Sequence, residues 1–170
     1  MRATSLTVAA LAAALVLTAC DSGGSGDDTK DSKTGSGCVD ELAVEFGPGN
    51  AAPAAGDTGN VPVTVTNGGG GSCSLNGLPA LAFEAGGAST AVAPDQAAAG
   101  GKTTLTQGAS TSFTLTYVLG DKGLDAQKAK VTLPGAAKAH SFKWSYGVVA
   151  LKSDGKTPDA SLSGFQQAGD

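Results

Sequence analysis

The amino-acid sequence predicts an all-β protein, an antiparallel β-sandwich that follows a disordered N-terminal tether. Several short segments alternate apolar and polar residues with a period of two, the pattern of half-buried strands. Clusters of Gly, Pro, Asn and Asp separate these segments and indicate turns. Only Leu124–Val131 has the pattern of a short helical turn. Many short strands with regular turns favour a sandwich.

Three segments show the clearest alternation, namely Val61–Asn67, Ser110–Leu119 and Ser141–Tyr146. The shorter strand candidates are Glu41–Phe46, Pro79–Glu84, Ser89–Ala93, Ala129–Leu133, Val148–Leu151 and Ala160–Phe165. All the aromatic residues fall within these candidates and lie far apart in the sequence. Their distribution favours packing in the core over an exposed platform for stacking.

The composition fits one globular domain with extensions. The chain has 170 residues, 26 of them Gly, and few aromatic residues, which predicts many turns and a small core. Its 11 basic and 15 acidic residues give a net charge of −4. Nucleic-acid binding is disfavoured because it normally needs a basic stripe or patch.

Residues 1–19 are predicted to be a lipoprotein signal peptide. Arg2 supplies a positive charge, and the uncharged run Leu6–Ala19 is too short to span a bilayer. Leu17–Cys20 resembles a bacterial lipobox, in which the Cys20 thiol receives a diacylglyceryl group, with palmitate a typical acyl chain, before cleavage. This predicts a protein anchored by two acyl chains to the extracytoplasmic face of the cell membrane. The alternative is an ordinary secretory peptide followed by an unrelated cysteine.

Residues 20–37 are predicted to be the lipidated Cys20 and a flexible linker. The segment Asp21–Gly37 contains no apolar residue and therefore has nothing to bury. A coil of this length reaches roughly 20–25 Å. The β-sandwich domain is predicted to occupy residues 38–170.

The remaining cysteines, Cys38 and Cys73, are an even pair in an exported chain, which predicts a disulfide. Two free thiols and a metal-binding pair are the alternatives. A metal is disfavoured because the mature chain offers one histidine, His140, and no methionine. No cofactor is predicted.

The stretch Thr66–Gly87 resembles the signature of an actinobacterial family of secreted proteins, domain of unknown function 4232. The matching residues are Asn67, Cys73, Leu75, Gly77 and Pro79, while Leu78 stands where tyrosine is commoner. The cysteine before the first short strand matches Cys38, and Thr103–Tyr117 resembles a later family segment. The resemblance implies an immunoglobulin-like sandwich on a lipoprotein tether. It implies no known activity and no catalytic residue.

The sequence predicts that this protein is not an enzyme. His140 is the sole histidine, and no nucleophile elbow is present. Two Gly-Lys-Thr triplets, at 101–103 and 155–157, lack the upstream glycine and the helix of a phosphate-binding loop. The glycine run Gly68–Gly71 also lacks a following helix and is interpreted as a long turn beside Cys73.

The function predicted from these observations is a membrane-anchored lipoprotein that displays a binding or interaction module, with an envelope protein or a polysaccharide as partner. Loops or an exposed strand edge would make the contact. A structural or accessory envelope lipoprotein without a discrete ligand is the second hypothesis. A hydrolytic enzyme is the third and most remote.

Overall fold

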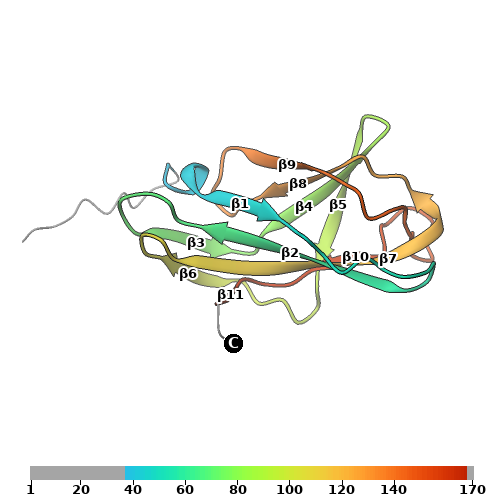
Figure 1. Ribbon diagram of the computed structural model, residues 1–170, viewed down its shortest axis with the longest axis horizontal. Coiled ribbons are helices and arrows are strands. Elements are labelled where there is room, and N and C mark those ends of the chain that lie inside the picture. The colour runs from blue at the N-terminus through green and yellow to red at the C-terminus, as the bar shows by residue number, and fades with distance from the viewer. Residues whose placement is uncertain (1–36, 168–170) are drawn as a thin grey trace, which may run out of the picture.

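The computed structural model describes residues 37–167 of the chain, and most of this part is β-structure. One short 3-10 turn, η1, precedes the strands (Figure 1). The elements are η1 Val39–Glu41, β1 Ala43–Phe46, β2 Thr58–Thr66, β3 Cys73–Gly77, β4 Ala80–Ala85, β5 Ala88–Pro94, β6 Gly101–Leu105, β7 Ser110–Leu124, β8 Lys128–Thr132, β9 Ala139–Lys143, β10 Ala160–Leu162 and β11 Gln166–Gln167.

The strands form a sandwich that closes toward a barrel. The main hydrogen-bonded path runs β1-β2-β7-β10-β5-β4-β8-β9, β11 pairs with β7, and β3 pairs with β6 in a separate ribbon. All neighbours are antiparallel except β10 and β5, which run parallel where Leu162 pairs with Pro94. The prediction of an all-β, antiparallel sandwich is confirmed, with this one parallel contact joining its two sheets.

The core lies between the two halves of the path. In β2 and β7 every second residue points inward, and in β4 and β8 the same alternation supplies the opposite wall. The buried residues of these four strands include Val61, Val63, Val65, Leu81, Phe83, Phe113, Leu115, Tyr117, Ala129 and Val131. The apolar residues that recur at every second position in the sequence are therefore the residues that the structure buries.

Aromatic side chains close the seam between β1 and β9, the two ends of the path. The rings of Phe46 and Phe142 stack with centroids 5.2 Å apart, and Trp144 packs edge-on against Phe83 at 4.9 Å. Tyr146 Oη accepts a hydrogen bond from Gly49 N at 3.0 Å. Both strands lie on the same side of the molecule in Figure 1. The sandwich is thus closed here by side chains. The predicted packing of aromatic residues in the core is confirmed for Phe83, Phe113, Tyr117 and Trp144, which are buried.

Several predicted elements differ from the structure. Leu124–Val131 is not helical, since Leu124 ends β7 and β8 begins at Lys128. Val148–Leu151 forms only isolated bridges, and η1 replaces the start of the Glu41–Phe46 strand. The predicted strand Ser141–Tyr146 is shorter in the structure, where β9 ends at Lys143. Trp144 N still donates to Gln127 O at 3.0 Å, and its buried side chain keeps the inward parity of Phe142. Its Nε1 donates to Gly147 O at 2.6 Å.

The signal peptide 1–19, the lipidation site Cys20 and the linker up to residue 36 lie outside the described residues, as do residues 168–170. Within the described part, no helix is long and apolar enough to cross a membrane.

Candidate functional site

The predicted disulfide joins Cys38 to Cys73, with Cα atoms 5.8 Å apart. Cys38 lies just before η1, and Cys73, which is buried, begins β3. The bond therefore attaches the first described turn to the small β3–β6 ribbon. The pairing expected for two cysteines of an exported chain is confirmed.

Asn67 organises the glycine run that precedes Cys73. Its Nδ2 donates to Gly71 O at 2.7 Å and to Leu105 O at 2.9 Å, and its Oδ1 accepts from Gly69 N at 3.0 Å. The side chain is only 3% exposed, and both of its polar atoms have partners inside the protein, as buried polar groups normally do. The Gly68–Gly71 run is a turn beside Cys73, as predicted, and the structure shows that Asn67 holds it.

The other residues of the predicted family motif are structural. Leu75 and Pro79 are buried. Gly77 ends β3 with a φ of +114°, a conformation that favours glycine. These residues shape the turn from β3 into β4.

His140, the sole histidine of the chain, lies within β9. It is half-buried in β9 opposite Val131 and shares a strand face with Phe142, as its parity predicted. No hydrogen bond or ion pair involves its side chain in the described part of the chain. Residues 37–167 contain no group of three His, Cys, Asp or Glu side chains that could hold a metal.

The two Gly-Lys-Thr triplets occupy different structures. Gly101-Lys102-Thr103 lies in β6, paired with β3. Gly155-Lys156-Thr157 lies in a turn whose backbone N–H groups at Lys156 and Thr157 donate to Asp154. Neither triplet precedes a helix, so neither is placed as a phosphate-binding loop.

A first hollow, of about 270 Å³, lies beside the glycine turn. Most of its wall is the backbone of Gly69, Gly70 and Gly71, and the side chains of Glu41, Asn67 and Ser72 complete it. The Asn67 amide is already bonded within the turn. This hollow therefore offers few side-chain groups to a ligand.

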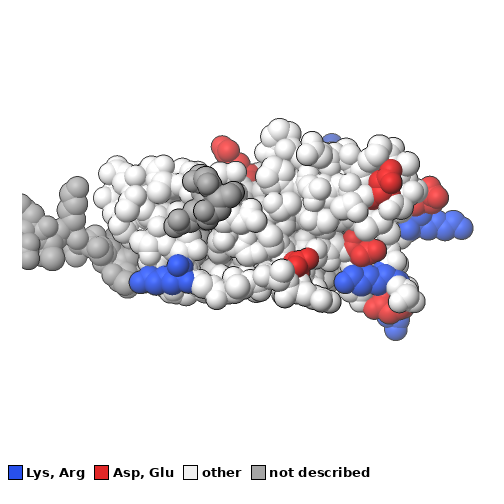
Figure 2. Space-filling view, turned by 90° about the horizontal axis from the view of Figure 1, so that it is seen from below, with Lys and Arg blue, Asp and Glu red and all other residues white. Residues whose placement is uncertain are grey.

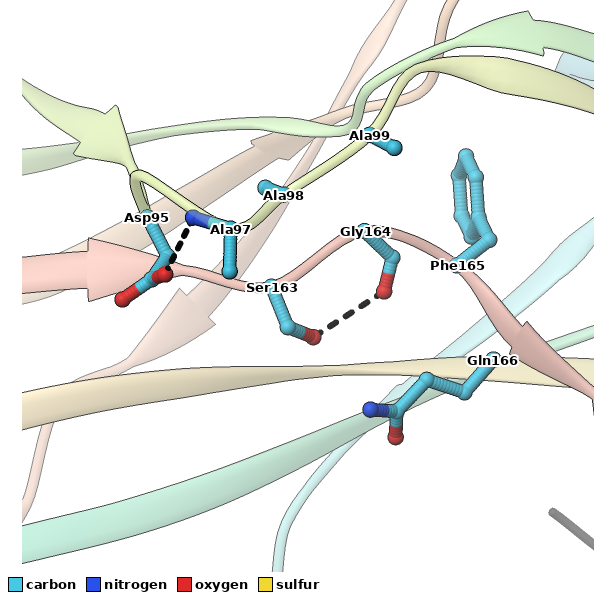
Figure 3. A pocket seen from close by; sticks show the side chains of 8 residues that line it. All are labelled: Asp95, Ala97, Ala98, Ala99, Ser163, Gly164, Phe165 and Gln166. Atoms are coloured by element: carbon cyan, nitrogen blue, oxygen red, sulfur yellow. Dashed lines mark hydrogen bonds between the residues drawn. The ribbon is translucent and has the colours of Figure 1, made fainter.

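A second hollow, of about 300 Å³, has a more varied lining (Figure 3). We call it the Phe165 hollow, and its lining consists of Asp95, Ala97, Ala98, Ala99, Ser163, Gly164, Phe165 and Gln166. The Phe165 ring forms one wall and the alanines line another. Asp95 Oδ1 accepts from Ala97 N at 2.8 Å, and the Ser163 hydroxyl donates to Gly164 O at 3.0 Å. The Gln166 amide and the second carboxylate oxygen of Asp95 are therefore the side-chain groups that a ligand could use. An apolar wall with a few polar groups is typical of small-molecule sites.

The Phe165 hollow arises because β10 is short. The chain leaves β10 at Leu162, and Asp95 N still donates to Leu162 O at 2.7 Å. Beyond that bond the loop after β5 diverges, and Ser163 turns to β7, where its Oγ accepts from Thr114 N at 2.9 Å. The Phe165 ring is held by an edge contact with Phe113 at 5.7 Å.

Sequence reasoning missed this hollow. Asp95 and the alanines belong to a loop, whereas Ser163 and Phe165 fall at the end of a predicted strand. The two segments lie far apart in the sequence, and only the parallel pairing of β5 with β10 brings them together. The short motif Pro-Asp before the alanine run was the one available sign of a turn.

A comparison with protein families gives one match. Residues 38–165 match the family model described as Domain of unknown function (DUF4232). No curated protein and no solved structure matches the chain. Because the matched segment covers well over half of the chain and contains the predicted motif, the protein belongs to this family of domains of unknown function.

Proposed function

We propose that this protein is a lipid-anchored extracytoplasmic lipoprotein whose β-sandwich is a non-catalytic binding module. The Phe165 hollow carries the proposal, since it combines an aromatic wall with polar groups on a disulfide-bonded scaffold. The lining residues lie mostly in the segments that directly follow β5 and β10. Backbone bonds fix where these segments begin, since Asp95 N donates to Leu162 O at 2.7 Å and Ser163 N donates to Thr114 O at 3.0 Å.

The anchoring part of the proposal rests on the Leu17–Cys20 motif and on the disulfide, which is typical of exported proteins. Replacing Cys20→Ala removes the thiol that would accept the diacylglyceryl group. We expect the variant to leave the membrane fraction, because its two-chain anchor is lost. Fractionation followed by immunoblotting measures this, with Cys73→Ser as a cysteine control that retains the anchor. A Cys20→Ala variant that stays with the membrane contradicts the proposal.

The binding part can be tested by crosslinking in cells followed by mass spectrometry. A binding module should capture one dominant partner, and Ala97→Trp should abolish the capture because the large side chain fills the Phe165 hollow. The matched control is Ala91→Trp, at an exposed position of β5 away from the hollow. A diffuse set of envelope neighbours, unchanged by Ala97→Trp, would exclude a single protein partner. If the protein also bound no polysaccharide, this result would favour an accessory lipoprotein without a discrete ligand.

A further inference from the structure

A broad strip of the sandwich surface carries no charged side chain. The outward residues of β2, the first half of β7, β10 and β11 are uncharged; we call this strip the neutral face. Its members are Thr58, Asn60, Pro62, Thr64, Thr66, Ser110, Ser112, Thr114, Thr116, Val118, Ser161, Ser163 and Gln166. In the view from below in Figure 2, charged residues gather toward one end and are sparse elsewhere.

The neutral face is rich in hydroxyl and amide groups held in register. Thr66 and Ser110 are cross-strand partners with their hydroxyl oxygens 2.8 Å apart. Thr116 Oγ1 donates to Asn60 Oδ1 at 2.8 Å. Such cross-strand pairs fix side-chain orientation, and each hydroxyl or amide retains capacity to donate or accept further bonds. The face therefore offers an ordered array of neutral donors and acceptors.

The Phe165 hollow opens at the border of this face. Gln166, which lines the hollow, is the register partner of Ser112 on the neutral face. Ser163, also in the lining, bonds to the backbone of Thr114. The Phe165 ring itself lies on the inward side, packed against Phe113. An extended ligand would therefore insert one unit into the hollow to reach this ring and lay its remaining units across β7 and β2.

An acidic residue lies at each of two borders of this surface. On one side Glu45 of β1, an exposed residue, is the register partner of Thr64. On the other side Asp95 lines the Phe165 hollow. Carboxylates at these two borders repel an anionic ligand, whereas they can accept hydrogen bonds from the hydroxyls of a neutral one.

The chemistry of this surface selects among ligand classes. Anionic polymers are recognised by Lys and especially Arg, but residues 37–167 contain no arginine, and the neutral face contributes no lysine. Protein partners are usually held by Trp, Tyr or Arg anchors, and none belongs to the neutral face. A sugar matches better, because its hydroxyls both donate and accept, and its apolar C–H face can lie on an aromatic ring.

We propose that the neutral face and the Phe165 hollow together bind a neutral polysaccharide. This inference rests on the proposed binding function and specifies its ligand class. Each hydrogen bond exchanged with water contributes little, so binding depends on many contacts along the polymer. Display of many anchored copies on one membrane would raise the avidity for a long chain.

The test uses the full chain, solubilised in a detergent without a sugar headgroup, and beads coated with dextran, mannan, galactan or polygalacturonate. We expect retention on at least one neutral polymer and none on polygalacturonate, which is anionic. Thr114→Glu should weaken binding by at least about tenfold, because its longer side chain holds the polymer away from the strand surface and its charge loses water in the contact. Retention on polygalacturonate alone, or on no polymer, would overturn the inference.

The matched control is Thr132→Glu. Thr132 is also a half-buried, outward threonine, but it lies in β8 on the other sheet, on the strand face that carries Lys128 and Lys130. We expect the affinity of the Thr132→Glu variant for the neutral polymer to stay within about twofold of that of the wild type, as for most surface changes away from a site. Equal weakening by both variants would refute the neutral face as the site. Thermal melting of both variants verifies that each is folded.

Failure of this inference can be separated from failure of the proposed function. If the in-cell crosslinks capture one protein and Thr114→Glu leaves that capture unchanged, the binding function stands and the polysaccharide inference is wrong. If neither a polymer nor a dominant partner is captured, both proposals are wrong.

Discussion

Asn67 shows how one side chain can organise a loop that has no regular structure of its own. Four glycines in succession lose much conformational entropy on folding. The Asn67 amide bonds to three backbone groups. Two of them, at Gly69 and Gly71, lie within the glycine run, and the third, at Leu105, ends β6. Its own N–H donates to Ala109 O at 2.9 Å. The residue therefore attaches the turn before Cys73 to both ends of the β6–β7 connection.

Replacing Asn67→Ala should lower the free energy of unfolding by about 2–4 kcal/mol, because several buried backbone groups lose their partners. Chemical denaturation of the purified chain measures this. Asn76→Ala is the control, since Asn76 is exposed on β3 and should change stability by less than about 0.5 kcal/mol. Equal effects of the two substitutions would contradict the assigned role of Asn67.

At the scale of one element, the turn Lys152–Thr157 is organised by Asp154. The Thr157 hydroxyl and the backbone N–H groups of Thr157 and Lys156 donate to its carboxylate. These bonds, that of the Thr157 hydroxyl foremost, lower the pKa of Asp154 from 3.8 to about 2. The second Gly-Lys-Thr triplet is thus the interior of a turn stabilised by a carboxylate.

This turn predicts an acid dependence. Because the folded pKa of Asp154 lies below its unfolded value, its contribution to stability is present above about pH 4 and is lost as the pH falls toward about 2. Asp154→Asn should therefore flatten the pH dependence of the unfolding free energy in this window. Thr157→Ala removes the largest cause of the shift and should have an intermediate effect. If the unfolding free energy of Asp154→Asn changed with pH as steeply as that of the wild type, Asp154 would not be the source of the acid dependence.

At the scale of the whole molecule, side chains and one covalent bond close a sandwich whose end strands do not pair. The stacked rings of Phe46 and Phe142 join β1 to β9. At one end of this seam, Asp40 Oδ1 accepts from Ala137 N at 2.9 Å and from Lys138 N at 3.1 Å. The Cys38–Cys73 bond lies near the same turn, η1. Closing the seam in this way protects the two free strand edges from pairing with other chains.

Loss of the disulfide should therefore be costly. The bond joins residues 35 apart in sequence, and closing such a loop stabilises by about 4 kcal/mol in the chain-entropy model. We expect the double variant Cys38→Ser with Cys73→Ser to melt well below the wild type in a calorimetric scan. Adding a reductant should lower the wild-type transition and leave that of the variant unchanged. Identical melting of the two proteins would contradict a structural role.

The sequence by itself determined the class of fold, the inward faces of β2 and β7, and the pairing of the two cysteines. Strict alternation places Val61, Val63 and Val65 on one side of any strand, and two cysteines can form only one intramolecular pair. Only the tertiary structure decided that Phe46 stacks on Phe142 and that β10 pairs in parallel with β5. Both depend on contacts between segments far apart in the chain, which local periodicity does not encode. The Phe165 hollow is also built from two segments that lie far apart in the chain, so local periodicity does not predict it.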